Sequence, residues 1–451
     1  MQVRDSTPLP ASEAALLWQM IRVASPVVVT QYTVVIMQVV DAWMLGSLGT
    51  NELAAIASSG LLILFLVSFG TGFMSSIITT VSQECGRRGP NTAIQFGWHG
   101  VYASLLLAIP FLMLWPFADK IFLFYGHEPQ LASLEGSYFR ISLLSIFPQL
   151  LSVSLSYYFI GLQETRLAML GSLLGMLLNA LFGYAMIFGA LGCPQLGFPG
   201  AAWATVTASF LQAGFLLFVF KRRNRHQGVA KWSSSHFARL CKLGFPAGLH
   251  SAVDILSWGV ILTYLIGFFG AAHLAAATVL VRCVQIAFLP ADGFAATMMS
   301  AVGQSLGAKE IGRAREQARL AFKVVATYMV GMGILFYLTR EPLMSLFTDD
   351  VEVIHIGVHA IVFVCFFQIF DALNLTYINA LYAAGDTLWP SIVNIILCLV
   401  VFVGGGRFLT EYYPHLESYG VWLVATVYIL AQGLCFYWRW RSGGWLQFVE
   451  R

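Results

Sequence analysis

Long apolar stretches recur along the whole chain, and each is separated from the next by a segment richer in polar residues. Each stretch holds roughly the 20 residues that an α-helix needs to cross a bilayer. The stretches are too continuous for barrel strands, and a lipid-exposed backbone must satisfy its own hydrogen bonds, so we expect helices. The pattern predicts twelve membrane spans, near residues 18–45, 53–84, 93–118, 136–160, 167–192, 199–220, 243–269, 274–306, 317–339, 352–382, 389–408 and 419–438.

The composition agrees with a chain whose main solvent is lipid. Of the 451 residues, 58% are hydrophobic and 10% are charged, whereas a soluble domain carries about 25% charged residues. These values exclude a disordered chain, a small disulfide scaffold and a multi-domain soluble enzyme. Five prolines fall inside the apolar stretches, where we expect kinks that neighbouring helices accommodate: Pro26, Pro110, Pro148, Pro246 and Pro290.

Basic residues outside the apolar stretches are divided unevenly between the two sides of the membrane. An even number of spans puts both termini on one side, and that side receives most of these residues, seven of them in 221–242. The opposite side has Lys120, Arg340 and Arg407. The positive-inside rule therefore predicts a multi-pass membrane protein with both termini and the 221–242 segment in the cytoplasm; we take the membrane to be the plasma (inner) membrane. Because topology accounts for the basic segment, we expect no nucleic-acid partner.

The second half of the chain repeats features of the first half at a constant offset of 221 residues. Val81-x-Gln83-x-x-Gly86 recurs as Val302-x-Gln304-x-x-Gly307, and Ala204-Thr205 recurs as Ala425-Thr426. Six spans per repeat make the two copies parallel, about an axis along the membrane normal. We therefore predict an all-α membrane protein with twelve transmembrane helices in two parallel six-helix repeats. The predicted units are an N-lobe (1–220), a cytoplasmic basic linker (221–242) and a C-lobe (243–451).

Four carboxylates lie well inside the predicted spans: Asp41, Asp254, Asp292 and Asp371. Each costs about 2.5–3.5 kcal/mol at the centre of a membrane helix, and such groups often mark ion or proton pathways. In the first half, Gln38 and Asp41 share a helical face, and Asn179 and Thr205 lie in the fifth and sixth spans. Their oxygen atoms suit Na⁺ or a carboxyl group that takes up a proton. For Asn179 and Thr205 the alternative is interhelical hydrogen bonding.

The second half offers a second candidate site. Gln368 precedes Asp371 by three residues, and Asp254 follows His250 by four, so each pair shares a helical face. Asp254 and Asp371 are candidates for binding a cation or proton. The alternative for one of the two acids is a salt bridge to Arg282.

Several motifs resemble signatures of the multidrug and toxic compound extrusion (MATE) family. They are the first-span stretch from Asp41 to Ala55, Gly197-Phe-Pro-Gly200-Ala-Ala-Trp-Ala-Thr205, Val302-Gly-Gln304-Ser-Leu-Gly307-Ala and Ala384-Gly385-Asp386-Thr387. The resemblance is to NorM-like members, while Val281-Arg282 and Phe288-Leu-Pro290 are similar to DinF-like members. It implies two lobes that form a V around a central cavity, and secondary antiport of cationic amphipathic drugs or metabolites against H⁺ or Na⁺ without a cofactor.

The resemblance also assigns coupling residues by motif position. They are Asp41, Asn179 and Thr205 in the N-lobe, and Asp254 and Asp371, with Gln368 before it, in the C-lobe. A bound Na⁺ is then expected at Asp41 or Asp371. One position departs from the family pattern: this chain has Gly183 where members often carry Asn or Asp, so one possible ligand is missing.

The expected mechanism is alternating access, in which an incoming ion displaces a small organic cation from the cavity between the lobes. Tyr157 and Tyr377 are candidate cavity residues, because aromatic rings stack on cations, together with Asp292 and Arg282. We expect a monomer that is not an enzyme. One rival is a lipid-linked oligosaccharide flippase of the same superfamily, which predicts a more cationic cavity. Another is an intramembrane enzyme, which needs a catalytic pair that the sequence does not offer.

Overall fold

The chain folds almost entirely into helices. The structure, a computed structural model, describes residues 13–46 and 50–449. Two π-helical stretches, Leu256–Ile261 and Cys398–Gly405, join α9 to α10 and α15 to α16. The α-helices are α1 (Glu13–Leu45), α2 (Thr50–Arg88), α3 (Ile94–Leu112), α4 (Ala118–Phe124), α5 (Pro129–Leu143), α6 (Ile146–Gly161), α7 (Thr165–Phe188), α8 (Phe198–Arg223), α9 (Ser234–Ile255), α10 (Leu262–Gly267), α11 (Ala271–Gly307), α12 (Ile311–Leu338), α13 (Arg340–Ser345), α14 (Val351–Ala384), α15 (Leu388–Leu397), α16 (Gly406–Tyr412), α17 (Glu417–Ser442) and α18 (Leu446–Val449).

The predicted membrane spans are confirmed within the described residues. Eleven helical segments there are long and apolar enough to cross a membrane, and the number is twelve if α5 and α6 form one bent span. The helices continue through Pro26, Pro246 and Pro290, and α3 passes Pro110 before it ends. These four prolines are therefore accommodated inside helices, as predicted.

The fourth predicted span, 136–160, is broken rather than kinked. It consists of α5 and α6, which meet at an angle of 42°, and Leu144 caps the end of α5. Pro148 has no backbone N–H to donate to the carbonyl of Leu144, four residues earlier, so the helical hydrogen-bond ladder is interrupted there. The helix axis changes direction at this missing bond.

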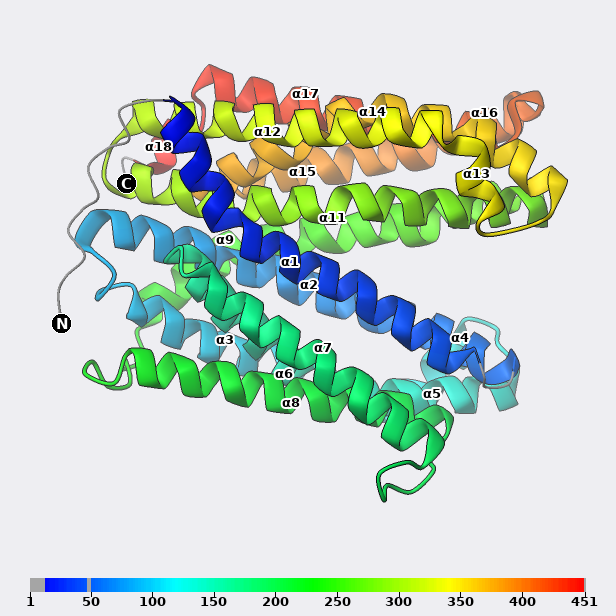
Figure 1. The fold of residues 1–451 in the computed structure, drawn as a ribbon, viewed down its shortest axis with the longest axis horizontal. Coiled ribbons are helices and arrows are strands. Elements are labelled where there is room, and N and C mark those ends of the chain that lie inside the picture. The colour runs from blue at the N-terminus through cyan, green and yellow to red at the C-terminus, as the bar shows by residue number, and fades with distance from the viewer. Residues whose placement is uncertain (1–12, 47–49, 450–451) are drawn as a thin grey trace.

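Basic residues gather at one end of the bundle, which we call the basic end; the opposite end is the far end. Arg87 and Arg88 lie in the last turn of α2, and Arg223 ends α8. The chain crosses from α8 to α9 at this end through residues 224–233. Figure 1 shows that α1 begins there and α17 ends there.

Helix α1 links the two halves of the chain. Its Glu13 accepts a hydrogen bond from Lys323 of α12 at 3.0 Å. From there α1 crosses α11 and continues beside α7 toward the far end (Figure 1). α1 therefore contacts helices of both halves along its length.

The repeated Val-x-Gln-x-x-Gly motif forms the crossing of α2 and α11 near the basic end. Gly86 of α2 lies against the backbone of Gln304, and Gly307 of α11 lies against the backbone of Gln83. A side chain on either glycine would overlap that backbone, so glycine is required for this close approach. In each contact the glycine of one copy of the motif meets the glutamine of the other copy, as expected if a pseudo-two-fold axis runs through the crossing.

Four polar side chains hold the halves together beside this crossing, and we call them the basic-end latch. Each donates a hydrogen bond to a backbone carbonyl at the end of a helix in the other half. The bonds run from Thr79 Oγ1 to Tyr382 (2.9 Å), from Gln83 Nε2 to Ala383 (2.7 Å), and from Ser300 Oγ and Gln304 Nε2 to Gly161 (3.0 Å each). Ser300 and Gln304 follow Thr79 and Gln83 by the repeat offset, so the latch also obeys the internal symmetry.

Candidate functional site

A buried polar network connects helices α9, α15 and α17. At its centre is Asn394 of α15, which is fully buried. Its carboxamide oxygen accepts hydrogen bonds from Tyr428 (2.5 Å) and Gln432 (2.7 Å) of α17. Its amide nitrogen donates to the backbone carbonyl of His250 at 3.2 Å and lies 3.5 Å from Asp254 Oδ1. Asn394 therefore connects α17 with the acidic face of α9.

Asp371 lies on the other side of this network, on α14. Its side chain is buried and lies within electrostatic reach of Asp254. Asn374, one turn later on α14, donates a hydrogen bond to Gln432 Oε1 at 3.2 Å. The fold thus brings Asp254 and Asp371, the two acids that the sequence singled out in this half, to the same network.

The two acids differ in their access to the surroundings. The Asp254 side chain is 41% exposed, and its Oδ2 lies 3.5 Å from Nε2 of the buried His250. Asp371 is only 4% exposed. Asp254 can therefore contact solutes directly, whereas Asp371 is shielded from them.

Gln368 lies one turn before Asp371 on α14. It is 1% exposed, and both its amide oxygen and its amide nitrogen are buried without a hydrogen-bond partner among the described residues. Buried polar atoms normally have a partner, and each exception calls for an explanation. Oxygen atoms are the ligands that hard cations prefer, and Gln368 and Asp371 offer oxygen atoms of that kind.

Both π-helical stretches lie next to this network. One begins two residues after Asp254, and the other begins four residues after Asn394. Ser257 and Cys398, one from each stretch, place Oγ and Sγ 3.1 Å apart. Such π-helical insertions occur frequently at functional sites, and here they occupy the two helices that carry Asp254 and Asn394.

The candidate residues of the first half lie on α1, α7 and α8. Asn179 Nδ2 donates to Thr205 Oγ1 at 3.2 Å, and Thr205 donates to the carbonyl of Ala201 at the same distance. Asn179 and Thr205 thus meet, through the interhelical bond that the sequence also allowed. Asp41 is half-buried and lies within electrostatic reach of Tyr138 of α5. The side chain of Gln38 lies outside the described part of the structure.

The space beside Gly183 is occupied by an apolar side chain. A Cβ atom on Gly183 would lie 2.9 Å from the methyl carbon of Met44 on α1, one turn after Asp41. Where the family pattern suggests a polar ligand, this chain therefore packs a methionine methyl group against a helix backbone.

Asp292 of α11 lies at the boundary between the halves. It accepts a hydrogen bond from Gln31 Nε2 of α1 at 3.0 Å. Tyr157 of α6 and Asp371 both lie within its electrostatic reach. Asp292 and Tyr157 are thus grouped between the halves, beside the polar network of the second half.

Tyr377 and Arg282, two predicted cavity residues, have surroundings other than the polar network. Tyr377 is 5% exposed and packs against the rings of Phe322 and Tyr437, at centroid distances of 5.9 and 5.0 Å. The structure therefore places Tyr377 in the packed core, and we leave it out of the site. Arg282 is exposed and donates to Gln285 in its own helix at 3.2 Å, whereas the ion-pair partner of Asp254 is His250.

The sequence pattern did not single out Asn394, Tyr428 or Gln432. Asn394 is an isolated polar residue in an apolar span, the same signal that drew attention to Asn179. Tyr428 and Gln432 are four residues apart and so share a face of α17. The signals were present, but nothing in the sequence shows that these three residues meet.

Comparison with known proteins agrees with this architecture. The MatE family model matches residues 26–185 and 246–405, one match in each half. Curated relatives include the "Probable multidrug resistance protein NorM" of Halalkalibacterium halodurans, 25% identical over 429 residues that cover 92% of each chain. The protein of the same name from Mesorhizobium japonicum is 28% identical over 383 residues, 82% of each chain.

Solved structures share the fold over almost the whole chain. A eukaryotic MATE transporter has a TM-score of 0.84 and 18% identity, with 97% of this chain and 98% of that chain covered. A multidrug resistance MATE family transporter, described as outward-facing, has a TM-score of 0.87 and 18% identity, with coverage of 95% and 96%. Because the family model matches most of the chain, in both halves, the chain belongs to the MatE family of multidrug efflux transporters.

Proposed function

We propose that the protein is a secondary antiporter that exports small organic cations in exchange for H⁺ or Na⁺. The observation that carries the proposal is the pairing of the buried Asp371 with the accessible Asp254. Two carboxylates within electrostatic reach of each other repel when both are charged, and a proton, Na⁺ or an organic cation bound there relieves the repulsion. Ion and substrate therefore compete for the same acids.

The surrounding network keeps these acids in place. Tyr428 and Gln432 hold the oxygen of Asn394, so that its amide nitrogen stays directed at the Asp254 side of α9. His250 Nε2 lies 3.5 Å from Asp254 Oδ2. In this scheme Asp254 meets the incoming ion, and Asp371 holds it away from water.

Coupling further requires that ion and substrate favour different conformations, since equal affinity would shift no equilibrium. We propose that the lobes, residues 1–220 and 243–451, rock about the crossing of α2 and α11, with 221–242 as the linker. The basic-end latch then holds one side shut while the far end is open.

The same proposal includes the setting of the transporter. It acts as a monomer in the plasma (inner) membrane, with its termini and the basic end in the cytoplasm. Asp41, with Asn179 and Thr205, forms a second coupling site in the N-lobe, so a bound Na⁺ lies at Asp41 or at Asp371. The acids near the lobe boundary favour a cationic substrate, which argues against a lipid-linked oligosaccharide flippase.

Transport by the reconstituted protein tests the proposal. With ethidium as the probe, a Na⁺ gradient and a pH gradient are imposed separately on proteoliposomes, and we expect one of them to drive ethidium movement. Asp371→Asn should lower that driven rate at least tenfold, because an amide of the same shape neither titrates nor carries charge. Asp349→Asn, on an exposed loop, is the matched control and should keep the parent rate. Ethidium movement that ignores both gradients, or an unaffected Asp371→Asn variant, would refute the antiport.

A further inference from the structure

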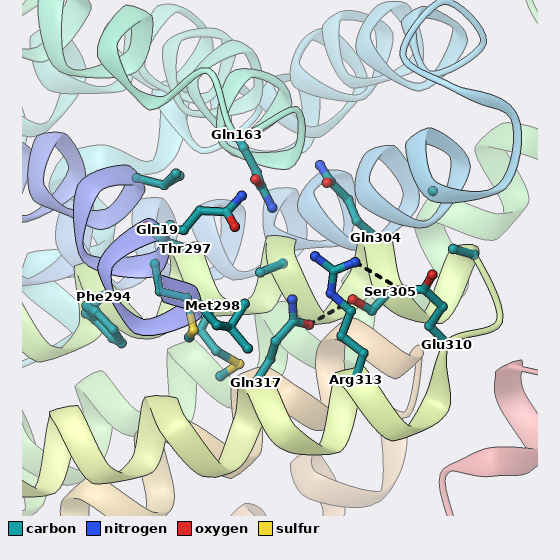
Figure 2. Close-up of a pocket in the computed structure, with 16 residues that line it drawn as sticks. Gln19, Gln163, Phe294, Thr297, Met298, Gln304, Ser305, Glu310, Arg313 and Gln317 are labelled. Atoms are coloured by element: carbon teal, nitrogen blue, oxygen red, sulfur yellow. Dashed lines mark hydrogen bonds and ion pairs between the residues drawn. The ribbon is translucent and has the colours of Figure 1, made fainter. Parts of the chain in front are cut away.

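A cavity of about 300 Å³ lies at the basic end, between α1, α11, α12 and the turn that joins α6 to α7. Figure 2 shows Gln19, Gln163, Gln304 and Gln317 with their amide groups turned toward the same space. Neither Asp254 nor Asp371 is among the described residues that line it. The cavity is therefore separate from the proposed coupling site.

The lining has a definite chemistry. A glutamine amide has both hydrogen-bond donors and an acceptor; here Gln317 Oε1 already accepts from Ser305 at 2.9 Å, and Gln304 Nε2 already donates to Gly161. The lining also includes Met20, Met298 and Phe294. The charged residues of the lining, Glu310 and Arg313, pair with each other at 3.2 Å. A flat aromatic cation that carries amino groups fits this lining, because its charge is delocalised, its faces suit sulfur and aromatic groups, and its amino groups can donate to amide oxygens.

The internal repeat explains why the opposite side of the crossing is packed more closely. On α9, Gly244 and Gly248 stand on either side of Pro246 and let this helix approach the backbone of α2. A Cβ atom on Gly244 would lie 2.6 Å from the carbonyl oxygen of Phe73, and one on Gly248 would lie 2.7 Å from that of Phe69. α9 therefore lies directly against α2.

Helix α1 takes the corresponding place against α11, but it lacks these glycines. When Pro26 is aligned with Pro246, an offset of 220 residues in this helix, Ala24 and Val28 stand at the positions of Gly244 and Gly248. Their side chains keep α1 from making the same close approach, and the cavity lies on this side, lined by Val23 of α1 and Phe294 of α11. The cavity therefore lies where the packing of α1 against α11 differs from that of α9 against α2.

The cavity also shares a residue with the basic-end latch. Gln304 lines the cavity and donates its latch hydrogen bond to the carbonyl of Gly161. Gln163, two residues beyond that carbonyl, also lines the cavity. An occupant whose amino group draws Gln304 Oε1 into the cavity rotates this amide, and the rotation moves Nε2 away from the Gly161 carbonyl. Occupancy of the cavity and closure of the latch are linked in this way.

We propose that this cavity is the site at which the substrate first binds from the basic end, and that its occupant is a flat aromatic cation with amino groups. Binding draws Gln304 away from Gly161 and so removes one bond of the latch before the basic end opens. This proposal rests on the export function proposed above.

Protection of an engineered thiol tests the site in the intact protein. Gln19→Cys places a thiol at the cavity, and Ser234→Cys places one at the exposed first residue of α9, at the same end of the bundle but outside the cavity. Labelling with a membrane-impermeant maleimide is followed by peptide mapping, which separates these sites from the seven native cysteines. The probe is ethidium, a flat monocation with two aryl amino groups. We expect ethidium to slow labelling of Gln19→Cys at least fivefold and to leave Ser234→Cys within twofold of its rate.

A cavity-filling variant, Ala301→Phe, gives a second measurement, in which ethidium uptake from the basic side should fall about tenfold. Ala275→Phe, at an exposed position of the same helix, is its control. Unprotected Gln19→Cys in a preparation that transports ethidium overturns the cavity proposal alone. Protection without gradient-driven transport supports the cavity and refutes the antiport, and the absence of both refutes both.

Discussion

At the scale of single residues, one buried asparagine connects the polar network of the second half. Asn394 is fully buried, and both ends of its amide are used, for Tyr428 and Gln432 on one side and for the backbone of His250 on the other. Its partners are themselves buried, so water cannot replace the asparagine if it is removed. A buried polar group left without a partner costs about 1–3 kcal/mol.

Asn394→Leu should therefore lower the free energy of unfolding by about 3 kcal/mol, because several buried groups lose their partner at once. The measurement is the apparent Tm of the intact protein in detergent. Asn379→Leu is the control, since the amide of Asn379 bonds only within its own helix, to the carbonyl of Leu375. In the double variant with Gln432→Leu, part of the loss should be recovered. An unchanged Tm for Asn394→Leu would show that the network adds nothing to stability.

At the scale of helices, the fourth span shows how one proline sets a direction. The break between α5 and α6 falls at the carbonyl that Pro148 cannot bond. The bend carries α5 to its place beside Asp41, where Tyr138 lies within reach of that acid. Glu135, also on α5, is fully buried and accepts hydrogen bonds from Ser58 of α2 and, at 2.8 Å, from His127.

Pro148→Ala should straighten this joint, because alanine restores the missing N–H donor and favours continuous helix. Ethidium transport in proteoliposomes should fall at least fivefold, since α5 then pulls away from α1 and α2. Pro129→Ala is a matched control, because Pro129 stands at the first position of α5, where the helix has no bond to lose. A parent-like rate for Pro148→Ala would show that the bend is not needed for transport.

At the scale of the whole molecule, the internal repeat has two consequences. Where it is obeyed, at Gly86 and Gly307 and in the four bonds of the latch, it builds a symmetric joint between the halves. Where it is broken, at Ala24 and Val28, a cavity lies beside the joint. The symmetric contacts give the two halves a common axis. The difference at Ala24 and Val28 places the cavity on the α1 side of that axis.

The four hydrogen bonds of the basic-end latch should determine how readily the basic end opens. Thr79→Val combined with Ser300→Ala removes two neutral hydrogen bonds of the latch, about 2 kcal/mol in total, which corresponds to roughly a thirtyfold shift toward the open state. Labelling of the native Cys85, which lies on α2 next to Gly86, should rise at least fivefold, as measured by peptide mapping after maleimide treatment.

Thr80→Val is the matched control for this pair, because Thr80 donates only to carbonyls of its own helix, those of Ser76 and Ile77. It should leave Cys85 labelling unchanged. If the double variant labels no faster than this control, the four bonds do not hold the basic end closed.

The sequence by itself determined the elements. The membrane spans and their helical nature follow from the hydrophobic pattern, since lipid leaves a backbone few alternatives. The repeat follows from the motifs that recur at a constant offset. The acids stood out because carboxylates are rare in apolar spans, and the motifs pointed to the family that the comparisons establish. Spacing along one helix also paired His250 with Asp254 correctly.

Only the tertiary structure decided which helices share a site. Asn394 joins Asp254 to α17, Gln31 reaches Asp292, and Tyr377 is buried in the core instead of facing a cavity. Periodicity tells which residues share a face of one helix, but in a bundle of apolar helices many faces are equivalent as packing surfaces. Which faces meet depends on close contacts such as those of Gly86 and Gly307, and these are properties of two helices together, which no single stretch of sequence contains.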